Sequence, residues 1–330
     1  MEPVGTLLLT RQDVAALLTI EESIAAVERV FKLYGEGRTT PPGILGVHAA
    51  DGGFHIKAGL LDLDRSYFAA KINANFPANP KRRNLPTIQG LIVLCDGEYG
   101  SPLAVMDSIE ITIQRTGAAT AIAAKYLARS DSKTAIICGC GNQGRISLRA
   151  LTKVLPIERV WAYDQDQSQA QSFASELAGE LRVDIKAVGD LETYVRQSDI
   201  CITCTPSKQP FFKKDYVAPG TFIAAVGADS AEKQELESTL LSHNRIVVDV
   251  LEQCADIGEL HHALNAGLIT TGDVYAELGE VIAGVKPGRT SSDEIIIFDS
   301  TGMALQDVVT AAAVYEKAVN NGAGTRMNFN

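Results

Sequence analysis

The sequence predicts an α/β protein of two domains, and three observations lead to this. From about residue 132, short apolar runs alternate with helix-like segments, which is typical of a parallel, doubly wound sheet. Residues 40–115 instead contain apolar runs separated by turn residues, as in an antiparallel or mixed sheet. A chain of 330 residues is long enough for two domains. We expect residues 1–130 and 304–330 to form one domain, and residues 131–303 the other.

The first domain is expected to begin with a helix over residues 7–35, where apolar side chains recur at helical spacing. Thr10 is a candidate cap for the start of that helix. A helix rich in small residues is expected over residues 115–129. Strands are expected at residues 54–57, 67–72 and 89–94.

The second domain should alternate strands with helices. Strands are expected at residues 134–138, 159–163, 183–187, 199–203, 221–226 and 245–249, with helices at 142–154, 166–179 and 190–197. After it, a helical segment over residues 304–320 is expected to pack on the first domain. The tail from Asn321 contains several Gly and Asn residues and is expected to be loose.

The strongest local motif follows the first of these strands. Gly139, Gly141 and Gly144 match G-x-G-x-x-G, in which the glycines allow a tight turn, close approach of a pyrophosphate and close helix packing. The helix that follows offers free N–H groups to phosphates. Glycine clusters also make ordinary turns, so the motif alone is a weak indication.

The context of the motif strengthens it. Asp164 ends the next apolar run, about 20 residues beyond the last glycine, where an acid binds the adenosine ribose and repels a 2′-phosphate. The sequence therefore predicts a Rossmann dinucleotide-binding domain that prefers NAD(H) to NADP(H). The alternative for Asp164 is that it caps the next helix.

Composition limits the partners. The net charge of −10 argues against nucleic acid and anionic membranes, because both are polyanions. No apolar run reaches the roughly 18 residues of a membrane span, and residues 1–3 do not begin a signal peptide. Six cysteines suit a reducing compartment better than a disulfide framework, so we expect a cytoplasmic protein.

No metal site is predicted. Cys201 and Cys204 form a C-x-x-C, but it lies in an apolar, strand-like run without a second pair. His261 and His262 belong to a helical segment, where adjacent side chains point in different directions, so the two are not expected to bind one ion.

Several motifs together carry a family resemblance. They are Leu85–Gly90, Ile111–Ala119, Val226–Asp229, Lys233 and Phe298–Gly302, which occur in this order in both predicted domains. With them, the chain resembles the ornithine cyclodeaminase/mu-crystallin family over nearly its whole length. The resemblance implies an NAD(P) Rossmann domain joined to a dimerising and substrate-binding α/β domain built from both chain ends, and hence a homodimer.

The resemblance also assigns roles to residues. It implies that Lys71 contacts the substrate carboxylate, that Arg115 serves both substrate and cofactor, and that Asp229 is the catalytic acid–base beside Lys71. Thr301 would line the substrate site. Besides Arg115 and the three glycines, the cofactor contacts implied are Thr87, Thr116, Asn142, Gln143, Asp164, Thr205, Val226, Gly227, Lys233 and Ser300.

Each of the three charged residues has a structural alternative. Lys71 could be a surface lysine that extends its ammonium group into water. Arg115 could simply pair with a carboxylate on a helix. Asp229 could cap a helix beginning near Glu232.

The sequence departs from the family at two places. Many members carry an arginine that clamps the substrate carboxylate just after the proline corresponding to Pro42, whereas this chain has Gly43. Ornithine cyclodeaminase itself has an acidic residue on the strand before the lysine, and we align His55 with that position.

These differences suggest a basic pocket. Because side chains alternate along a strand, His55 and Lys57 share one face. If that face lines the site with Lys71 and Arg115, the cluster repels an ω-ammonium group and attracts a second carboxylate. One such pair at 4 Å is worth roughly 4 kcal/mol before desolvation. The alternative is that His55 and Lys57 face solvent on an edge strand.

Together these inferences predict NAD(H)-dependent reduction of an α-imino acid to an L-amino acid, or the reverse oxidative deamination. The basic pocket makes iminosuccinate, reduced to aspartate, the leading substrate. Deaminating cyclisation of ornithine, alanine dehydrogenation and reduction of 1-pyrroline-2-carboxylate are the alternatives. Small-ligand binding of the mu-crystallin kind is the non-enzymatic one.

Overall fold

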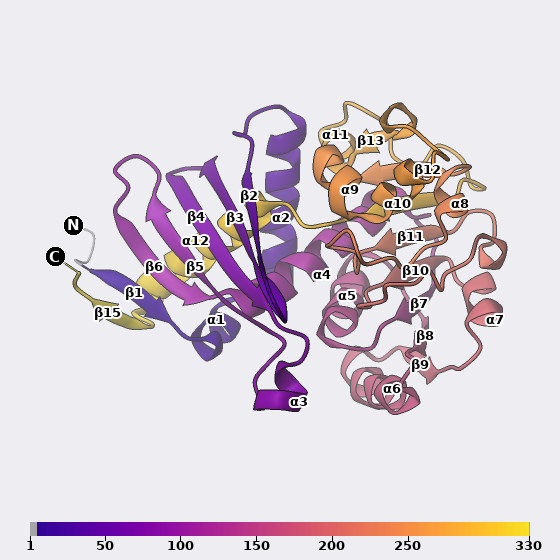
Figure 1. The fold of residues 1–330 in the computed structure, drawn as a ribbon, viewed down its shortest axis with the longest axis horizontal. Coiled ribbons are helices and arrows are strands. Elements are labelled where there is room, and N and C mark those ends of the chain that lie inside the picture. Colours follow the sequence, from indigo (N-terminus) through magenta and orange to yellow (C-terminus); the bar gives the residue numbers. More distant parts are fainter. Residues whose placement is uncertain (1–4, 330) are drawn as a thin grey trace. The chain divides into compact units, whose positions relative to one another are not determined.

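A computed structural model describes residues 5–329, which fall into two compact units (Figure 1). Unit 1 comprises the described residues of Met1–Val30, Gly37–Arg115 and Met303–Asn330, and unit 2 comprises Phe31–Glu36 and Thr116–Gly302. Unit 1 thus combines segments from both ends of the chain. The division falls inside two helices, α2 (Ile20–Gly35) after Val30 and α4 (Ser108–Leu127) after Arg115.

Unit 1 contains a seven-stranded sheet in the order β15-β1-β6-β5-β4-β3-β2. Its strands are β1 (Thr6–Leu9), β2 (Gly43–Ala49), β3 (Gly52–Asp62), β4 (Ser66–Asn75), β5 (Ile88–Asp96), β6 (Pro102–Asp107) and β15 (Thr325–Met327). Strands β1 and β6 run parallel and the other neighbours antiparallel, so the sheet is mixed, as predicted.

One long helix covers a face of this sheet. Helix α12 (Ala304–Asn321) packs on β3, β4 and β5, which confirms the predicted return of the C-terminal helix to the first domain. The packing is close at Gly59, where an added Cβ atom would lie 2.8 Å from a methyl carbon of Leu305. The other helices with residues in unit 1 are α1 (Arg11–Leu17), α2 (Ile20–Gly35), α3 (Asn79–Arg83) and α4 (Ser108–Leu127).

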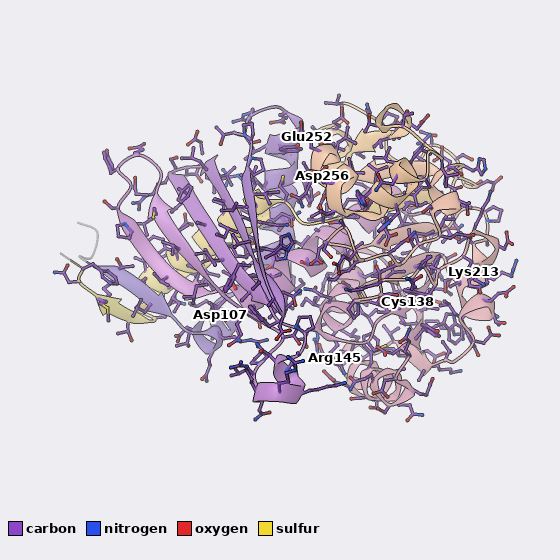
Figure 2. The ribbon with its side chains drawn as sticks, viewed as in Figure 1. Asp107, Cys138, Arg145, Lys213, Glu252 and Asp256 are labelled. Atoms are coloured by element: carbon purple, nitrogen blue, oxygen red, sulfur yellow. The ribbon has the colours of Figure 1, made fainter. Side chains whose placement is uncertain are left out.

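Three predictions about this half of the chain were wrong at their ends. Instead of one helix over residues 7–35, residues 7–9 form part of strand β1, and two helices, α1 and α2, follow. Thr10 caps α1 together with Asp13 in a capping box. The tail is not loose throughout, because β15 pairs with β1. Helix α4 begins at Ser108 rather than 115, since the carboxylate of Asp107 (Figure 2) accepts the N–H groups of its first turn.

Unit 2 contains an eight-stranded parallel sheet in the order β13-β12-β14-β11-β10-β7-β8-β9. Its strands are β7 (Thr134–Cys138), β8 (Arg159–Tyr163), β9 (Asp184–Ala187), β10 (Ile200–Thr203), β11 (Phe222–Ala225), β12 (Arg245–Val248), β13 (Ala276–Glu277) and β14 (Ile296–Asp299). The run β9-β8-β7-β10-β11 has the 3-2-1-4-5 order of Rossmann domains, and β14, the last strand of the unit in the chain, takes the sixth place. The predicted fold class is confirmed.

The helices of unit 2 mostly follow the predicted positions. They are α5 (Asn142–Val154), α6 (Gln167–Leu181), α7 (Leu191–Arg196), α8 (Ser238–Leu241), α9 (Leu251–Ile257), α10 (Glu259–Asn265) and α11 (Leu278–Ile282), with short 3-10 turns at Lys214–Tyr216 and Thr271–Asp273. Fully buried side chains such as Ile136, Ile223 and Ile297 join the sheet to these helices. Within residues 5–329, no helix combines the length and the apolar character needed to span a membrane.

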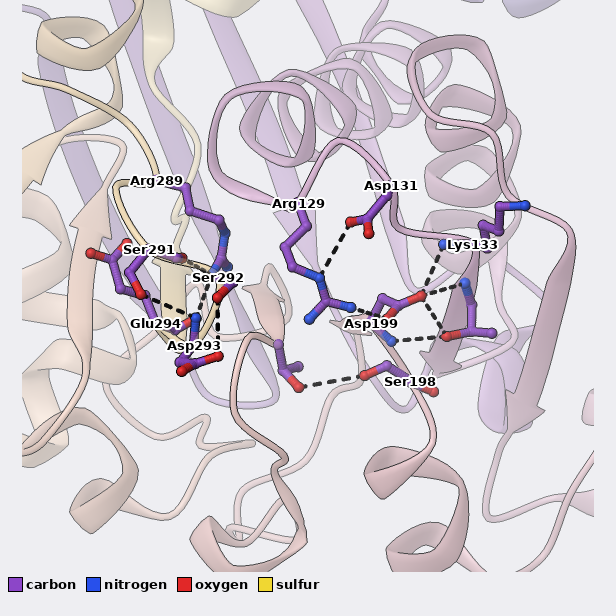
Figure 3. A network of polar contacts seen from close by, with 12 residues as sticks. Arg129, Asp131, Lys133, Ser198, Asp199, Arg289, Ser291, Ser292, Asp293 and Glu294 are labelled. Carbon is purple, nitrogen blue, oxygen red and sulfur yellow. Dashed lines mark hydrogen bonds and ion pairs between the residues drawn. The ribbon is translucent and has the colours of Figure 1, made fainter.

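A polar network lies at the end of this sheet where its parallel strands begin (Figure 3). Asp199, just before β10, accepts the backbone N–H groups of Lys133 and Thr134, each at 2.9 Å. It also accepts the Thr134 hydroxyl and pairs with Arg129. The network joins the start of β7 to the start of β10. It lies at the opposite end of these strands from the glycine motif.

Candidate active site

The glycine motif has the backbone geometry that a dinucleotide requires. Gly139 has a φ of +104°, and a Cβ atom there would lie 2.9 Å from the carbonyl oxygen of Cys204. At Gly144, a Cβ atom would lie 2.1 Å from the Gly139 oxygen. No atom of the described residues lies within 4 Å of a Cβ placed on Gly141, so space is left for a pyrophosphate beside the start of α5.

Asp164 holds this loop from the end of β8. Its carboxylate accepts the N–H of Cys140 at 2.8 Å and that of Asp166 at 3.0 Å. The alternative that Asp164 caps the next helix is wrong, because the N-cap of α6 is Asp166, which accepts the N–H of Ser168. Asp164 therefore lies at the carboxyl end of the second strand of the Rossmann order, the position of a ribose-binding acid.

A buried glutamate, which sequence reasoning missed, organises the next two strand ends. The Glu235 carboxylate accepts the N–H and hydroxyl of Thr205 at 2.6 and 2.7 Å, the Thr203 hydroxyl at 2.7 Å and the Gly227 N–H at 3.0 Å. Burial raises the pKa of Glu235, while these donors oppose the rise. Thr205, Val226 and Gly227 are thereby fixed at the carboxyl ends of β10 and β11. No sequence pattern distinguished Glu235 from a surface acid.

Asp229 and Lys233 lie on the loop that follows β11. Their side chains form an ion pair with 2.6 Å between Oδ1 and Nζ, and the Asp229 side chain is 55% exposed. The alternative role for Asp229, capping a helix near Glu232, is wrong because the next helix, α8, begins only at Ser238. The carboxylate is accessible, as an acid–base group has to be.

Ser300 and Thr301 follow β14, where a buried aspartate on the neighbouring strand end holds them. Asp249 accepts the Ser300 hydroxyl at 2.8 Å and the Gly302 N–H at 2.6 Å. Gln253 donates to the hydroxyl of Thr301 at 2.5 Å. The predicted cofactor residues of unit 2, apart from Thr116 in α4, thus gather at or just beyond the carboxyl ends of parallel strands, where open α/β sheets bind ligands.

In unit 1, four polar side chains share one face of the sheet. Lys57 on β3 lies directly opposite Lys71 on β4, and His55 lies opposite Asn73. Strand β3 is not an edge strand, because β2 pairs along its outer side. His55 is nevertheless exposed, Lys57 is partly buried and Lys71 is buried.

Lys71 and Arg115 share one carboxylate, that of Asp307 on α12. The Asp307 Oδ2 lies 2.6 Å from Lys71 Nζ, and its Oδ1 lies 3.3 Å from Arg115 Nε. Gln306 accepts a hydrogen bond from Arg115 Nη1 at 3.1 Å. Because Lys71 is only 3% exposed, the alternative that it reaches into water is wrong. The alternative that Arg115 pairs with a helix carboxylate is observed.

The charges of this cluster do not cancel. With Lys71 protonated, Lys71 and Arg115 carry +1 each and Asp307 carries −1, so the sum is +1. Burial lowers the pKa of Lys71 to about 7, with Arg115 and Lys57 adding to the effect and Asp307 opposing it. Burial works against ionisation of Asp307 as well, but the two cations hold the pKa of that carboxyl below its usual range. A buried, uncompensated positive charge favours binding of an anion.

Gly43 lies away from this cluster. In the β2–β3 ladder Gly43 is opposite Ala58, whereas Ile44 is opposite Lys57. A side chain at position 43 would therefore start on the sheet face that does not carry Lys71. Thr87, in the loop before β5, is partly exposed, and its carbonyl accepts the N–H of Phe76 at 2.8 Å.

The two histidines of α10 serve as hydrogen-bonding groups. His261 Nδ1 lies 3.1 Å from the carbonyl oxygen of Ala255, and His262 Nε2 lies 2.7 Å from that of Lys233. In the described part of the chain, no three His, Cys, Asp or Glu side chains are grouped so that they could hold a metal ion.

Comparison with known proteins agrees with these features. The model of the ornithine cyclodeaminase/mu-crystallin family matches residues 4–322. The chain belongs to this family. Alanine dehydrogenase of Archaeoglobus fulgidus is 41% identical over 324 residues, with 98% of each chain covered. Iminosuccinate reductase of Paracoccus denitrificans is 33% identical, with 98% of this chain and 100% of that protein covered.

Solved structures of family members share the whole fold. An archaeal alanine dehydrogenase dimer with bound NAD has a TM-score of 0.94 at 41% identity, over 99% of this chain and 100% of that one. The Δ1-pyrroline-2-carboxylate reductase of Thermococcus litoralis, in complex with NADH and L-proline, has a TM-score of 0.92 at 36% identity, over 98% and 100%. These relatives act on amino or imino acids, but their names differ in the substrate.

Proposed function

We propose that this chain is an NAD(H)-dependent oxidoreductase that reduces an α-imino acid to an L-amino acid or catalyses the reverse reaction. The observation that carries the proposal is the buried cluster of Lys71, Arg115 and Asp307, whose net charge of +1 matches one substrate carboxylate. The glycine loop and Asp164 of unit 2 fit NAD(H), and relatives of the same fold hold NAD or NADH. A carboxylate at position 164 favours NAD over NADP.

Each site residue then has one task. Lys71 and Arg115 hold the α-carboxylate and so orient the α-carbon, which makes the reaction effectively unimolecular. Asp229, paired with Lys233, exchanges the proton on the substrate nitrogen, a contribution typically worth about 10²–10⁴-fold. NAD(H), when bound, supplies or accepts the hydride at the α-carbon.

Iminosuccinate, reduced to aspartate, is the first candidate substrate. Lys57 lies opposite Lys71 and acts electrostatically on both Lys71 and Asp307. The ammonium group of Lys57 would therefore favour a substrate with a second carboxylate. The second candidate is the imine of pyruvate, giving alanine, which needs only the +1 of Lys71, Arg115 and Asp307. The 41% identity to an alanine dehydrogenase favours it.

Cyclising deamination fits the cluster less well. A substrate with an ω-ammonium group needs a carboxylate partner, and the Asp307 carboxylate already binds two cations. Lys57 would moreover repel that ammonium group.

We also propose that the protein is a homodimer whose subunits pair through the sheet of unit 1. The face opposite α12 carries a continuous row in which Leu45, Ile56, Ile72 and Leu91 are register neighbours. Leu45 is 55% exposed, Ile72 42% and Leu91 53%, an apolar surface of the kind that a second copy covers. Light scattering should give twice the chain mass, and Ile72→Glu should give the monomer. A wild-type monomer would contradict this assembly.

The function is tested by following NADH consumption with three substrates: oxaloacetate plus ammonia, pyruvate plus ammonia, and 1-pyrroline-2-carboxylate. Consumption that requires both oxaloacetate and ammonia and yields aspartate supports the first candidate. If only pyruvate with ammonia is turned over, the second candidate is supported, and Lys57 does not bind a second substrate carboxylate. Ammonia release from ornithine would favour cyclodeamination, and ligand binding without any turnover would favour a binding protein.

A further inference from the structure

Asp307 has no role yet in the reaction, although it lies at the centre of the cationic cluster. It is in the first turn of α12 and only 2% exposed. Its two oxygens are divided between two cations, with Oδ2 at Lys71 and Oδ1 at Arg115. A buried carboxylate with this geometry fixes the position of both cations relative to each other.

We propose that Asp307 is a positioning residue of the substrate site: it keeps Lys71 charged and orients Arg115, so that the two cations bind one substrate carboxylate. The inference rests on the proposed function, because it assigns Lys71 and Arg115 to that carboxylate. Asp307 itself carries a negative charge and would repel the carboxylate, so its effect is exerted through the two cations.

Asp307 favours the protonated form of Lys71. The groups that act on its ammonium are Lys57 from β3, Arg115 and Thr112 from α4, and Asp307 from α12. Two of these are cations and one is a hydroxyl, so Asp307 is the negative group that favours the protonated form. Without it, burial and the neighbouring cations would leave a neutral amine, which binds a carboxylate poorly.

Asp307 also helps to orient the guanidinium of Arg115. Two consecutive residues of α12 hold it, Gln306 at Nη1 and Asp307 at Nε. Gln306 is fully buried and Asp307 nearly so, which restricts the rotamer of Arg115. A planar guanidinium held at two of its three nitrogens keeps its remaining N–H groups in a fixed direction for a ligand.

The pH dependence follows from the sign of the shift. The pKa of Lys71 is lowered to about 7, so the ammonium is present below that pH and is lost as the pH rises through it. Carboxylate binding should therefore weaken above about pH 7 in the wild type. In Asp307→Asn the pKa falls further, and the loss should begin at a lower pH.

The experiment compares Asp307→Asn with Asp307→Glu, which keeps the charge. Asp199→Asn serves as the matched control. It also removes a carboxylate that pairs with an arginine, but this carboxylate lies in unit 2, where the strands of the parallel sheet begin. Two quantities are measured: the pH profile of kcat/KM for the imino acid that the wild type reduces, and the titration of Lys71 by NMR of ¹³C,¹⁵N-lysine, assigned with Lys71→Met.

For Asp307→Asn we expect a Lys71 pKa lower by about one unit or more, and a KM raised roughly tenfold at neutral pH with a much smaller change in kcat. Asp307→Glu should restore the titration more fully than the KM, because its extra methylene displaces the contacts. Asp199→Asn should leave both quantities unchanged. An unchanged Lys71 titration in folded Asp307→Asn would overturn the inference.

The inference can still be tested if the wild type is inactive or if Asp307→Asn does not fold. If the wild type reduces no imino acid, the proposed function fails, while the Lys71 titration still decides whether Asp307 controls its charge. If Asp307→Asn does not fold, Asp307→Glu decides: the inference predicts a raised KM, because the longer side chain displaces the contacts to Lys71 and Arg115, and an unchanged KM would overturn it.

Discussion

Two of the arginine-paired aspartates, Asp307 in unit 1 and Asp199 in unit 2, have surroundings that differ in a way that separates structure from function. Asp199 accepts two backbone N–H groups and a hydroxyl besides its bond to Arg129. Burial raises its pKa, but these donors and Arg129 lower the value below its usual range. Arg129 also lies 3.4 Å from the carboxylate of Asp131, so one guanidinium faces two carboxylates and this network has no surplus positive charge.

Asp307 instead faces two cations, and the group lies deeper. The surplus positive charge costs free energy in the unliganded protein, because a buried charge without a partner is poorly solvated. A ligand carboxylate removes that cost. The Asp199 network, which has no surplus positive charge, joins strands, whereas the surplus positive charge around Asp307 marks the place where we expect an anionic ligand to bind.

The largest expected effect comes from breaking the unbalanced cluster. Lys71→Met removes one of the two cations that bind the α-carboxylate, so kcat/KM should fall roughly 10²–10³-fold. NADH affinity, measured by fluorescence titration, should change little, because the proposed dinucleotide loop belongs to unit 2. Loss of NADH binding of the same size would mean that Lys71 supports the fold or the cofactor instead.

A smaller effect should reveal how many carboxylates the cluster accepts. Lys57→Met removes one positive charge beside Lys71, which should weaken iminosuccinate reduction roughly five- to tenfold while alanine formation stays within a factor of two. The measurement is the ratio of the two kcat/KM values in the variant and the wild type. Equal losses of kcat/KM for both substrates would show that Lys57 does not bind the second carboxylate.

The smallest kinetic effect is expected at the Asp199 network. Asp199→Asn removes one of the two carboxylates that face Arg129 and weakens the bonds to Lys133 and Thr134, which should destabilise the fold by about 1–3 kcal/mol. The Tm by calorimetry should fall while KM, kcat and their pH profiles stay unchanged. A shifted pH profile in this variant would abolish the distinction between the two clusters.

Sequence patterns predicted unit 2 more accurately than unit 1. Strand β7, helix α5 and strand β8 begin and end where expected, because local apolar runs and the glycine motif determine them. In unit 1, residues 7–9 and the tail form strands only by pairing with each other and with β6. Such non-local pairing leaves no periodic trace over so few residues.

The candidate site shows the same division. The family motif led to Lys71 and Arg115, but their partner Asp307 is more than 190 residues further along the chain than Arg115. An acid in the first turn of a helix is also expected from the helix dipole alone, so nothing in the sequence distinguished it. Glu235 was missed for a related reason, since its four hydrogen bonds join residues from three separate segments.

The most direct test of the central claim is a crystal structure of the protein with NADH and the amino acid that it forms. The account predicts that the α-carboxylate contacts both Lys71 and Arg115, with Asp307 still bound to the two cations. A carboxylate bound by other residues, with the Lys71–Asp307–Arg115 cluster left without an anion, would contradict it.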